Sequence, residues 1–284
     1  MKTINEYCHF ILCSEKLEDK LKSPPDDLVD ERNDSDTERS RNTPNRESRI
    51  QISDKKSKIP RLEHLHIPIN RGLALHHFAN HELMATEIFA WALLKFQTIS
   101  DKSRLDLFSS LKEEQKHLKL YLERMQELGI EFGERPLNGI FWKYIPLMSN
   151  FEKFSAIMSI SFEGANLDYA TIYQKTFAQY GDSKSAEIME IVFLDELKHV
   201  KRGLKVLQKR EDESISEWDY YKSLLDHPFT PRRAKGYFYI PDTRRKVGFS
   251  EDFILKLAEY KDEFSNRKKE IIPEELAKWG IYTG

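Results

Sequence analysis

The sequence has little cysteine, no long apolar run and almost no net charge, and each shortage excludes a class of protein. Its two cysteines, Cys8 and Cys13, cannot form a disulfide framework and lack the Cys-x-x-Cys spacing of redox and zinc motifs. No apolar run approaches the roughly 18 residues that a membrane helix needs, and Phe10–Leu12 is too short for the core of a signal peptide. The net charge of −2 gives no overall attraction to nucleic acid. We therefore expect a cytoplasmic protein without a membrane segment.

Aliphatic and aromatic residues are also scarce between Ser23 and Pro60, where Asp, Glu, Arg, Ser, Asn and Pro predominate. Such a segment buries too little apolar surface to offset the entropy lost on ordering. We expect a low-complexity linker over 23–60, preceded by a short docking segment over 1–22. The main domain then occupies 61–210, and a C-terminal extension with a helix occupies 211–284.

Apolar residues that recur every three or four positions predict four long helices in the main domain. Their expected ranges are 71–96, 101–128, 151–180 and 183–209. Short turns at 98–101 and 181–183 make two antiparallel hairpins, and the Gly- and Pro-containing stretch 129–149 is a long connection between them. One long crossover between two hairpins is the ferritin-like form of the four-helix bundle. The predicted fold is therefore all-α and ferritin-like.

Each predicted hairpin carries a lone glutamate followed by Glu-x-x-His. The spacing between the two glutamates is 32 residues in the first hairpin (114 − 82) and 33 in the second (196 − 163). Residues three apart share a helical face, so each Glu-x-x-His presents both side chains together. The predicted metal ligands are Glu82, Glu114, His117, Glu163, Glu196 and His199.

Four buried carboxylates without compensating charge would each cost several kcal/mol or would take up protons. Two divalent cations would neutralise them, so the pattern predicts a di-metal site. Mixed oxygen and nitrogen ligands with open positions suit iron or manganese better than structural zinc. Glu87 and Asp168 are the competing acids, each five residues after Glu82 or Glu163. Glu87 would give a spacing of 27 (114 − 87), against 33 in the second hairpin, and Asp168 a spacing of 28 (196 − 168), against 32 in the first. Glu82 and Glu163 match the other hairpin more closely and are therefore preferred.

Further residues are expected around the ligands. Asp195 and Glu113 each precede a ligand glutamate, and a ligating histidine usually donates its second N–H to a carboxylate. We expect Asp195 to orient His117 and Glu113 to orient His199; the alternative for both is an ordinary exposed acid. Three tyrosines are expected to line the site, with plain core packing as the alternative: Tyr121, Tyr169 and Tyr173.

The segments that contain these motifs resemble those of the ferritin-like family catalogued as domain of unknown function 455. The segments that carry the resemblance are His77–Glu87, Glu113–His117, Phe162–Asp168 and Asp195–His199. It extends to Lys20–Pro25 and Pro231–Gly236, whereas the run between about residue 34 and residue 58 departs from it. The resemblance implies a ferritin-like fold and a di-metal site but no agreed substrate. A more distant similarity is to the di-iron hydroxylases that act on tRNA and on quinone precursors.

Three functions are compatible with this interpretation. The first is an O2-dependent oxidase or monooxygenase with two iron ions (or manganese), an electron donor and a small-molecule substrate that the sequence does not specify. The second is a metal-handling ferroxidase or a peroxide-scavenging protein. The third is an RNA-binding hydroxylase that uses the basic and aromatic stretch 229–249, whose alternative role is to pack on the bundle. The sequence leaves the oligomeric state open, a homo-oligomer included.

Overall fold

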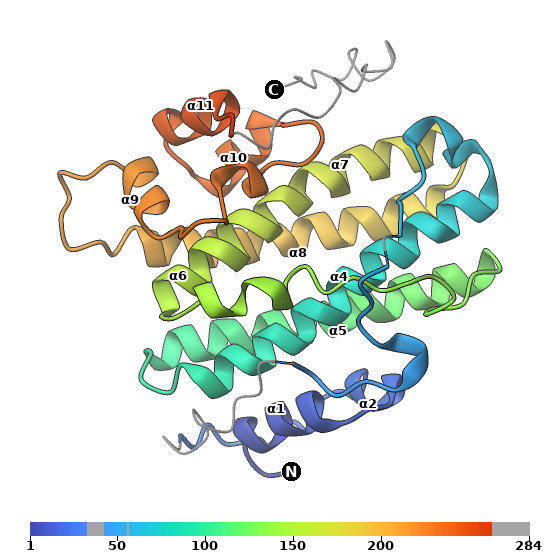
Figure 1. Cartoon of the computed structure of the whole chain (residues 1–284), viewed down its shortest axis with the longest axis horizontal. Coiled ribbons are helices and arrows are strands. Elements are labelled where there is room, and N and C mark those ends of the chain that lie inside the picture. The colour runs from blue at the N-terminus through green and yellow to red at the C-terminus, as the bar shows by residue number, and fades with distance from the viewer. Residues whose placement is uncertain (33–42, 56, 263–284) are drawn as a thin grey trace. The chain divides into compact units, whose positions relative to one another are not determined.

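The computed structural model describes residues 1–32, 43–55 and 57–262, and all regular elements in this part of the chain are helical, apart from two isolated β-bridges (Figure 1). The predicted all-α class is confirmed. The chain divides into two compact units, Met1–Pro146 with Thr176–Ile188 (unit 1) and Leu147–Lys175 with Met189–Gly284 (unit 2). Residues 33–42 and 56 of the predicted linker, and residues 263–284 of the predicted C-terminal extension, lie outside the described residues. None of the helices described is long and apolar enough to cross a membrane.

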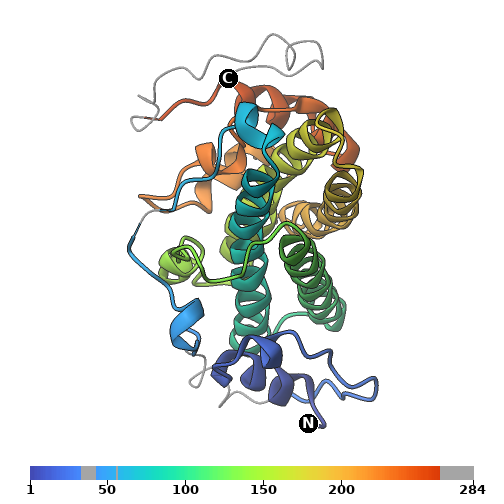
Figure 2. The same ribbon diagram turned by 90° about the vertical axis from the view of Figure 1, so that its right-hand side faces the viewer.

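Unit 1 is built on a hairpin of two long helices, α4 (Pro68–Lys95) and α5 (Asp101–Glu127), which lie side by side in both views (Figures 1 and 2). Pro68 occupies the first turn of α4, where its missing N–H costs nothing. Ser100 caps α5 by accepting a hydrogen bond from the backbone N–H of Ser103 (3.2 Å). Gly129, with φ of +75°, follows the end of α5.

The N-terminal segment of unit 1 packs its helix α1 (Ile4–Cys13) against α4. Lys20 is the last residue of α2 (Leu17–Lys20), and its ammonium lies 3.0 Å from Oε1 of Glu87 on α4. Arg46, inside the predicted linker, donates to both carboxylate oxygens of Glu87 (3.0 and 2.6 Å), and Trp142 donates to one of them (3.1 Å). Burial alone would raise the pKa of Glu87, but the charges of Arg46 and Lys20 hold it below its usual value. The linker is therefore attached to the helical hairpin at Arg46.

Unit 2 contains α6 (Phe151–Ser155), a π-helix (Ala156–Phe162) and most of α7 (Glu163–Gln179) and α8 (Ser183–Leu207). The sequence predicted one uninterrupted α-helix over 151–180, so the π-helical turn is a correction. Ser161 stabilises it by donating to the carbonyl of Ala156, five residues back (2.7 Å). Gly203 on α8 allows the close approach of this turn, because a Cβ there would lie 2.4 Å from the Cβ of Ser159.

The C-terminal extension of unit 2 packs on α7 and α8 through α9 (Glu217–Ser223), α10 (Pro241–Val247) and α11 (Glu251–Glu259). The extension is held to α7 by the buried carboxylate of Asp168. This carboxylate accepts two hydrogen bonds from the Arg244 guanidinium, one of them 2.9 Å long. It also accepts hydrogen bonds from the backbone N–H groups of Gly236 (2.9 Å) and Ile240 (3.0 Å). Gly236 is required here, because a Cβ would lie 2.8 Å from the Cβ of Asp168.

Arg244→Ala should strongly destabilise the protein, because it leaves the Asp168 carboxylate buried with only backbone donors. We expect the free energy of unfolding, measured by urea denaturation, to fall by about 3–5 kcal/mol. Arg245→Ala is the matched control. The Arg245 side chain is 45% exposed and pairs with Asp242 and Glu251 on the surface, so its removal should change the unfolding midpoint little. Equal losses in the two variants would contradict this assignment.

His76 on α4 should make the protein less stable in acid. Its Nε2 accepts a hydrogen bond from the backbone N–H of Gly133 (3.0 Å), and burial lowers its pKa from 6.5 to about 4. Between these values the unfolded chain binds a proton that the folded chain does not, so this contribution to stability is lost as the pH falls. His76→Gln removes the titration. The stability advantage of the wild type over this variant should therefore shrink from pH 7 to pH 4, whereas parallel curves would refute the assignment.

Candidate metal centre

The hairpin of unit 1 brings two carboxylates and one imidazole together. Glu82 lies on α4, and Glu114 and His117 lie on α5, all three buried. The Nδ1 of His117 lies 3.5 Å from Oε2 of Glu82 and 3.7 Å from Oε2 of Glu114. One ligand atom from each of the three lies within 4.8 Å of the others. We call this group the unit 1 triad.

Unit 2 contains a second group of the same composition, the unit 2 triad. Glu163 is the first residue of α7, and Glu196 and His199 lie on α8; again all three are buried. The Nδ1 of His199 lies 3.7 Å from Oε1 of Glu163 and 3.4 Å from Oε2 of Glu196, and the three ligand atoms lie within 4.8 Å of one another. Each triad thus assembles the three residues that its own half of the sequence predicts.

Local structure explains why these side chains meet. In each triad the Glu-x-x-His spacing places a carboxylate and an imidazole on one face of the second helix of the hairpin. In unit 2 the π-helix ends directly before Glu163, and π-helical turns inside α-helices occur frequently at functional sites because they rotate the residues that follow. The turn is held by Ser161, whose hydroxyl lies 2.7 Å from that of Tyr221 on α9.

The electrostatics of α4 separate two kinds of buried glutamate. Burial raises the pKa of Glu82 well above its usual value, and the neighbouring carboxylate of Glu114 raises it further, although His117 lowers it. Glu87, in contrast, is neutralised by Lys20 and Arg46. A buried carboxylate whose charged neighbours are another carboxylate and an imidazole is stabilised by binding a cation. This contrast favours Glu82 over Glu87 as a ligand.

On α7 the contrast between the two acids lies in their hydrogen-bond and ion-pair partners. Asp168 is engaged by Arg244 and two backbone N–H groups, and Glu163 lies beside His199. The geometry therefore favours Glu163 over Asp168 as a ligand.

Asn166 is a neighbour of the unit 2 triad that we did not predict from the sequence. Its amide donates to Oε1 of Glu196 (2.8 Å), so it fixes the orientation of that carboxylate. The signal was available, because Asn166 lies three residues after Glu163 and so shares its helical face.

The other predicted neighbours have contacts of their own. Asp195 accepts a hydrogen bond from Lys198 (2.7 Å), and Glu113 is half-buried on α5. Tyr121 is buried with its ring 6.1 Å from that of Phe78, and half-buried Tyr169 packs edge-on against Tyr237 (5.3 Å). The orienting roles expected for Asp195 and Glu113 remain predictions.

The donor set of each triad is two carboxylates and one imidazole, so both triads fit a metal ion that accepts oxygen and nitrogen ligands. A family model described as "Protein of unknown function (DUF455)" matches residues 5–255, a range that contains both triads. The chain belongs to the DUF455 family. No curated protein and no solved structure matches the chain. The DUF455 description names no reaction, so a function has to be inferred from the buried side chains of the two triads.

Glu82→Gln should have opposite effects on stability and on metal affinity. In the metal-free protein it removes an acid whose ionised form is destabilised by burial and by Glu114, so the thermal unfolding midpoint should rise. It also removes a ligand charge, so the affinity for Mn²⁺ or Fe²⁺ should fall by more than about tenfold, the lower limit typical of changes in supporting residues. Calorimetric titration and a thermal melt in chelator measure both quantities.

The control is Glu123→Gln, an exposed acid on the same helix as Glu114, which should change neither quantity. A lowered midpoint together with unchanged metal affinity in Glu82→Gln would show that Glu82 is structural and is not a ligand.

Proposed function

We propose that the two triads together hold two metal ions inside a ferritin-like four-helix bundle formed by α4, α5, α7 and α8. The observation that carries the proposal is the duplication. Each hairpin supplies two buried carboxylates and one buried imidazole, with ligand atoms within 4.8 Å. The ligand set of the di-iron and di-manganese carboxylate proteins is the same: two lone glutamates and two Glu-x-x-His pairs, six residues in all.

Charge supports two divalent ions. The four glutamates carry four negative charges when ionised, and two divalent cations supply four positive charges. The loaded centre is then close to neutral, as a buried site requires. Carboxylate and imidazole ligands suit both iron and manganese, and we propose iron as the resident metal. Glu82, Glu114, Glu163 and Glu196 would hold the two ions together with His117 and His199.

We propose further that the protein is an O2-dependent oxidase or monooxygenase. A bound iron pair would supply the redox and O2 chemistry that amino-acid side chains lack. The chain's own residues would hold and orient the pair: the two histidines as neutral ligands, and Asn166 by fixing Glu196. Helices buried on most sides would exclude water around the centre. An electron donor and an organic substrate complete the reaction.

The alternatives differ in what the chain must provide. A ferroxidase or peroxide-scavenging protein uses the same ligands but needs no organic substrate, so the ligands do not separate it from an oxidase.

RNA binding would require free basic side chains in the basic and aromatic stretch 229–249. Arg244 bonds Asp168, Lys235 donates to the carbonyls of Ala258 (2.9 Å) and Tyr260 (3.0 Å), and Arg245 pairs on the surface. These contacts favour a packing role for this stretch over RNA binding.

The experiment that tests the proposal is O2 consumption by the iron-loaded protein. Protein loaded with Fe(II) without oxygen and then mixed with O2 should take up about one O2 per iron pair, and continued uptake should require a reductant. Glu114→Gln should abolish the uptake, and Glu123→Gln should not. Uptake without dependence on a reductant, with iron retained in a large particle, would favour the metal-handling alternative. No uptake above that of free iron would contradict both.

A further inference from the structure

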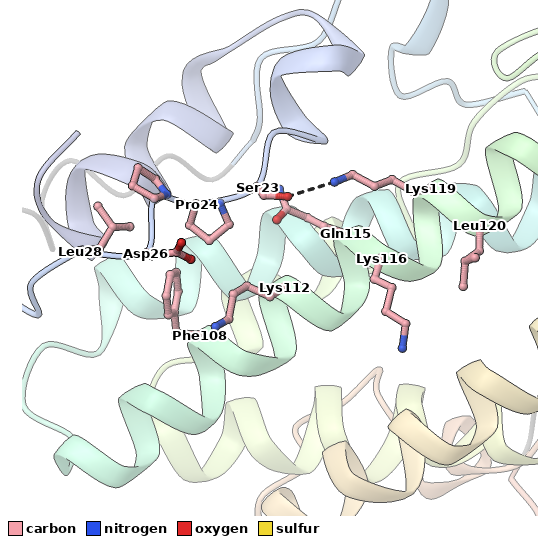
Figure 3. A pocket seen from close by; sticks show the side chains of 11 residues that line it. Ser23, Pro24, Asp26, Leu28, Phe108, Lys112, Gln115, Lys116, Lys119 and Leu120 are labelled. Carbon is pink, nitrogen blue, oxygen red and sulfur yellow. Dashed lines mark hydrogen bonds between the residues drawn. The ribbon is translucent and has the colours of Figure 1, made fainter.

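A pocket in unit 1 lies on the face of α5 that points away from the unit 1 triad. Its volume is about 510 Å³, within the range typical of small-molecule sites. Lys112, Gln115 and Lys119 recur along this face at helical spacing (Figure 3). At 100° per residue, Glu114 and His117 lie roughly 140–200° around the helix from Lys112. The pocket is therefore a separate site, and a ligand could bind there whether or not the triads hold metal.

The wall opposite α5 is the segment Ser23–Leu28, and it is fixed at both ends. At one end Gln115 donates to the carbonyls of Lys20 (2.6 Å) and Lys22 (3.2 Å), and the hydroxyl of Tyr7 also donates to Lys22 (2.7 Å). At the other end the backbone N–H of Val29 donates to the carbonyl of Lys2 (2.9 Å), as part of a bridge with the N-terminal residues. The pocket is thus preformed, and binding there would not have to order the wall.

Two of the lysines at this pocket, Lys112 and Lys119, lack acidic partners among the described residues. The ammonium of Lys119 lies 3.2 Å from the hydroxyl of Ser23, and that of Lys112 lies 5.1 Å from the centre of the Phe108 ring. Lys102, on the same helix, instead pairs with Asp106 (3.4 Å). In Figure 3 the Lys119 side chain reaches toward Ser23 and the Lys112 side chain lies beside Phe108. Both ammonium groups can therefore donate to an anion without first breaking an ion pair.

The charge and apolar surface of the pocket define the ligand it suits. The charged residues that line it are Lys112, Lys116, Lys119 and Asp26, which together give a net charge of +2 (3 − 1). The rest of the lining is largely apolar: Pro24, Pro25, Leu28, Phe108 and Leu120. A phosphate monoester carries about −1.5 to −2 charges at pH 7 and offers three acceptor oxygens to ammonium donors. An apolar or aromatic group attached to it would contact Phe108 and the prolines.

We propose that this pocket binds a small phosphate monoester that carries an apolar or aromatic group. Lys112 and Lys119 donate to the phosphate, and the ring of Phe108 packs against the organic part. The carboxylate of Asp26 disfavours a more densely charged polyanion in the same space. A pocket of this size suits a small molecule better than an extended chain.

The test is calorimetric titration of the full chain with phenyl phosphate, inorganic phosphate and phenol. Phenyl phosphate should bind saturably at one site, and the other two should bind at least about tenfold more weakly, because each lacks one of the two recognised parts. Lys112→Gln and Lys119→Gln should each weaken phenyl phosphate binding about tenfold, the loss expected for one charge-assisted hydrogen bond. Lys102→Gln, on the same helix but outside the pocket, should leave it unchanged. Thermal midpoints verify that the variants are folded.

Three outcomes would overturn the proposal. The first is no saturable binding of phenyl phosphate by the folded wild type. The second is an equal loss of affinity in Lys102→Gln, which would mean non-specific attraction to a basic helix. The third is a short single-stranded RNA that displaces phenyl phosphate and binds more tightly, which would assign the pocket to a polymer instead of a small molecule.

Discussion

The structure depends on how its buried carboxylates are neutralised. Glu87 and Asp168 are neutralised from within the chain, the first by Arg46 and Lys20 and the second by Arg244. The carboxylates of the triads lie beside other carboxylates and an imidazole. A buried acid that approaches another acid raises the energy of the folded state unless a proton or a metal ion compensates. The same helices therefore contain two arrangements of buried acids, one neutralised by basic side chains and one that we propose is neutralised by metal ions.

The internal duplication extends beyond the triads. On α4 the neutralised acid follows the triad glutamate by five residues (87 − 82), and on α7 the spacing is also five (168 − 163). In each case an arginine from a segment outside the hairpin reaches the second acid: Arg46 from the N-terminal part and Arg244 from the C-terminal extension. The segments at the two ends of the chain thus make equivalent contacts, since each supplies an arginine to a buried acid on its hairpin.

Much of the fold could be predicted, because periodicity and end signals act locally. The range expected for the second helix, 101–128, differs from Asp101–Glu127 by one residue, since Ser100 caps it and Gly129 follows it. The π-helix before Glu163 could not be predicted in the same way, because it depends on Ser161 and Tyr221 and on the absence of a side chain at Gly203. Arg46 was also missed: its own segment is polar, and only its distant partner Glu87 makes its burial favourable.

The most direct test of a shared di-metal centre is the position of the metals in a crystal of the iron-loaded protein, located by anomalous diffraction at the iron edge. We predict two peaks about 3.5–4 Å apart, the separation typical of two-metal sites, with His117 bound to one ion and His199 to the other. A single peak, or two peaks much farther apart than the separation typical of two-metal sites, would contradict a shared centre.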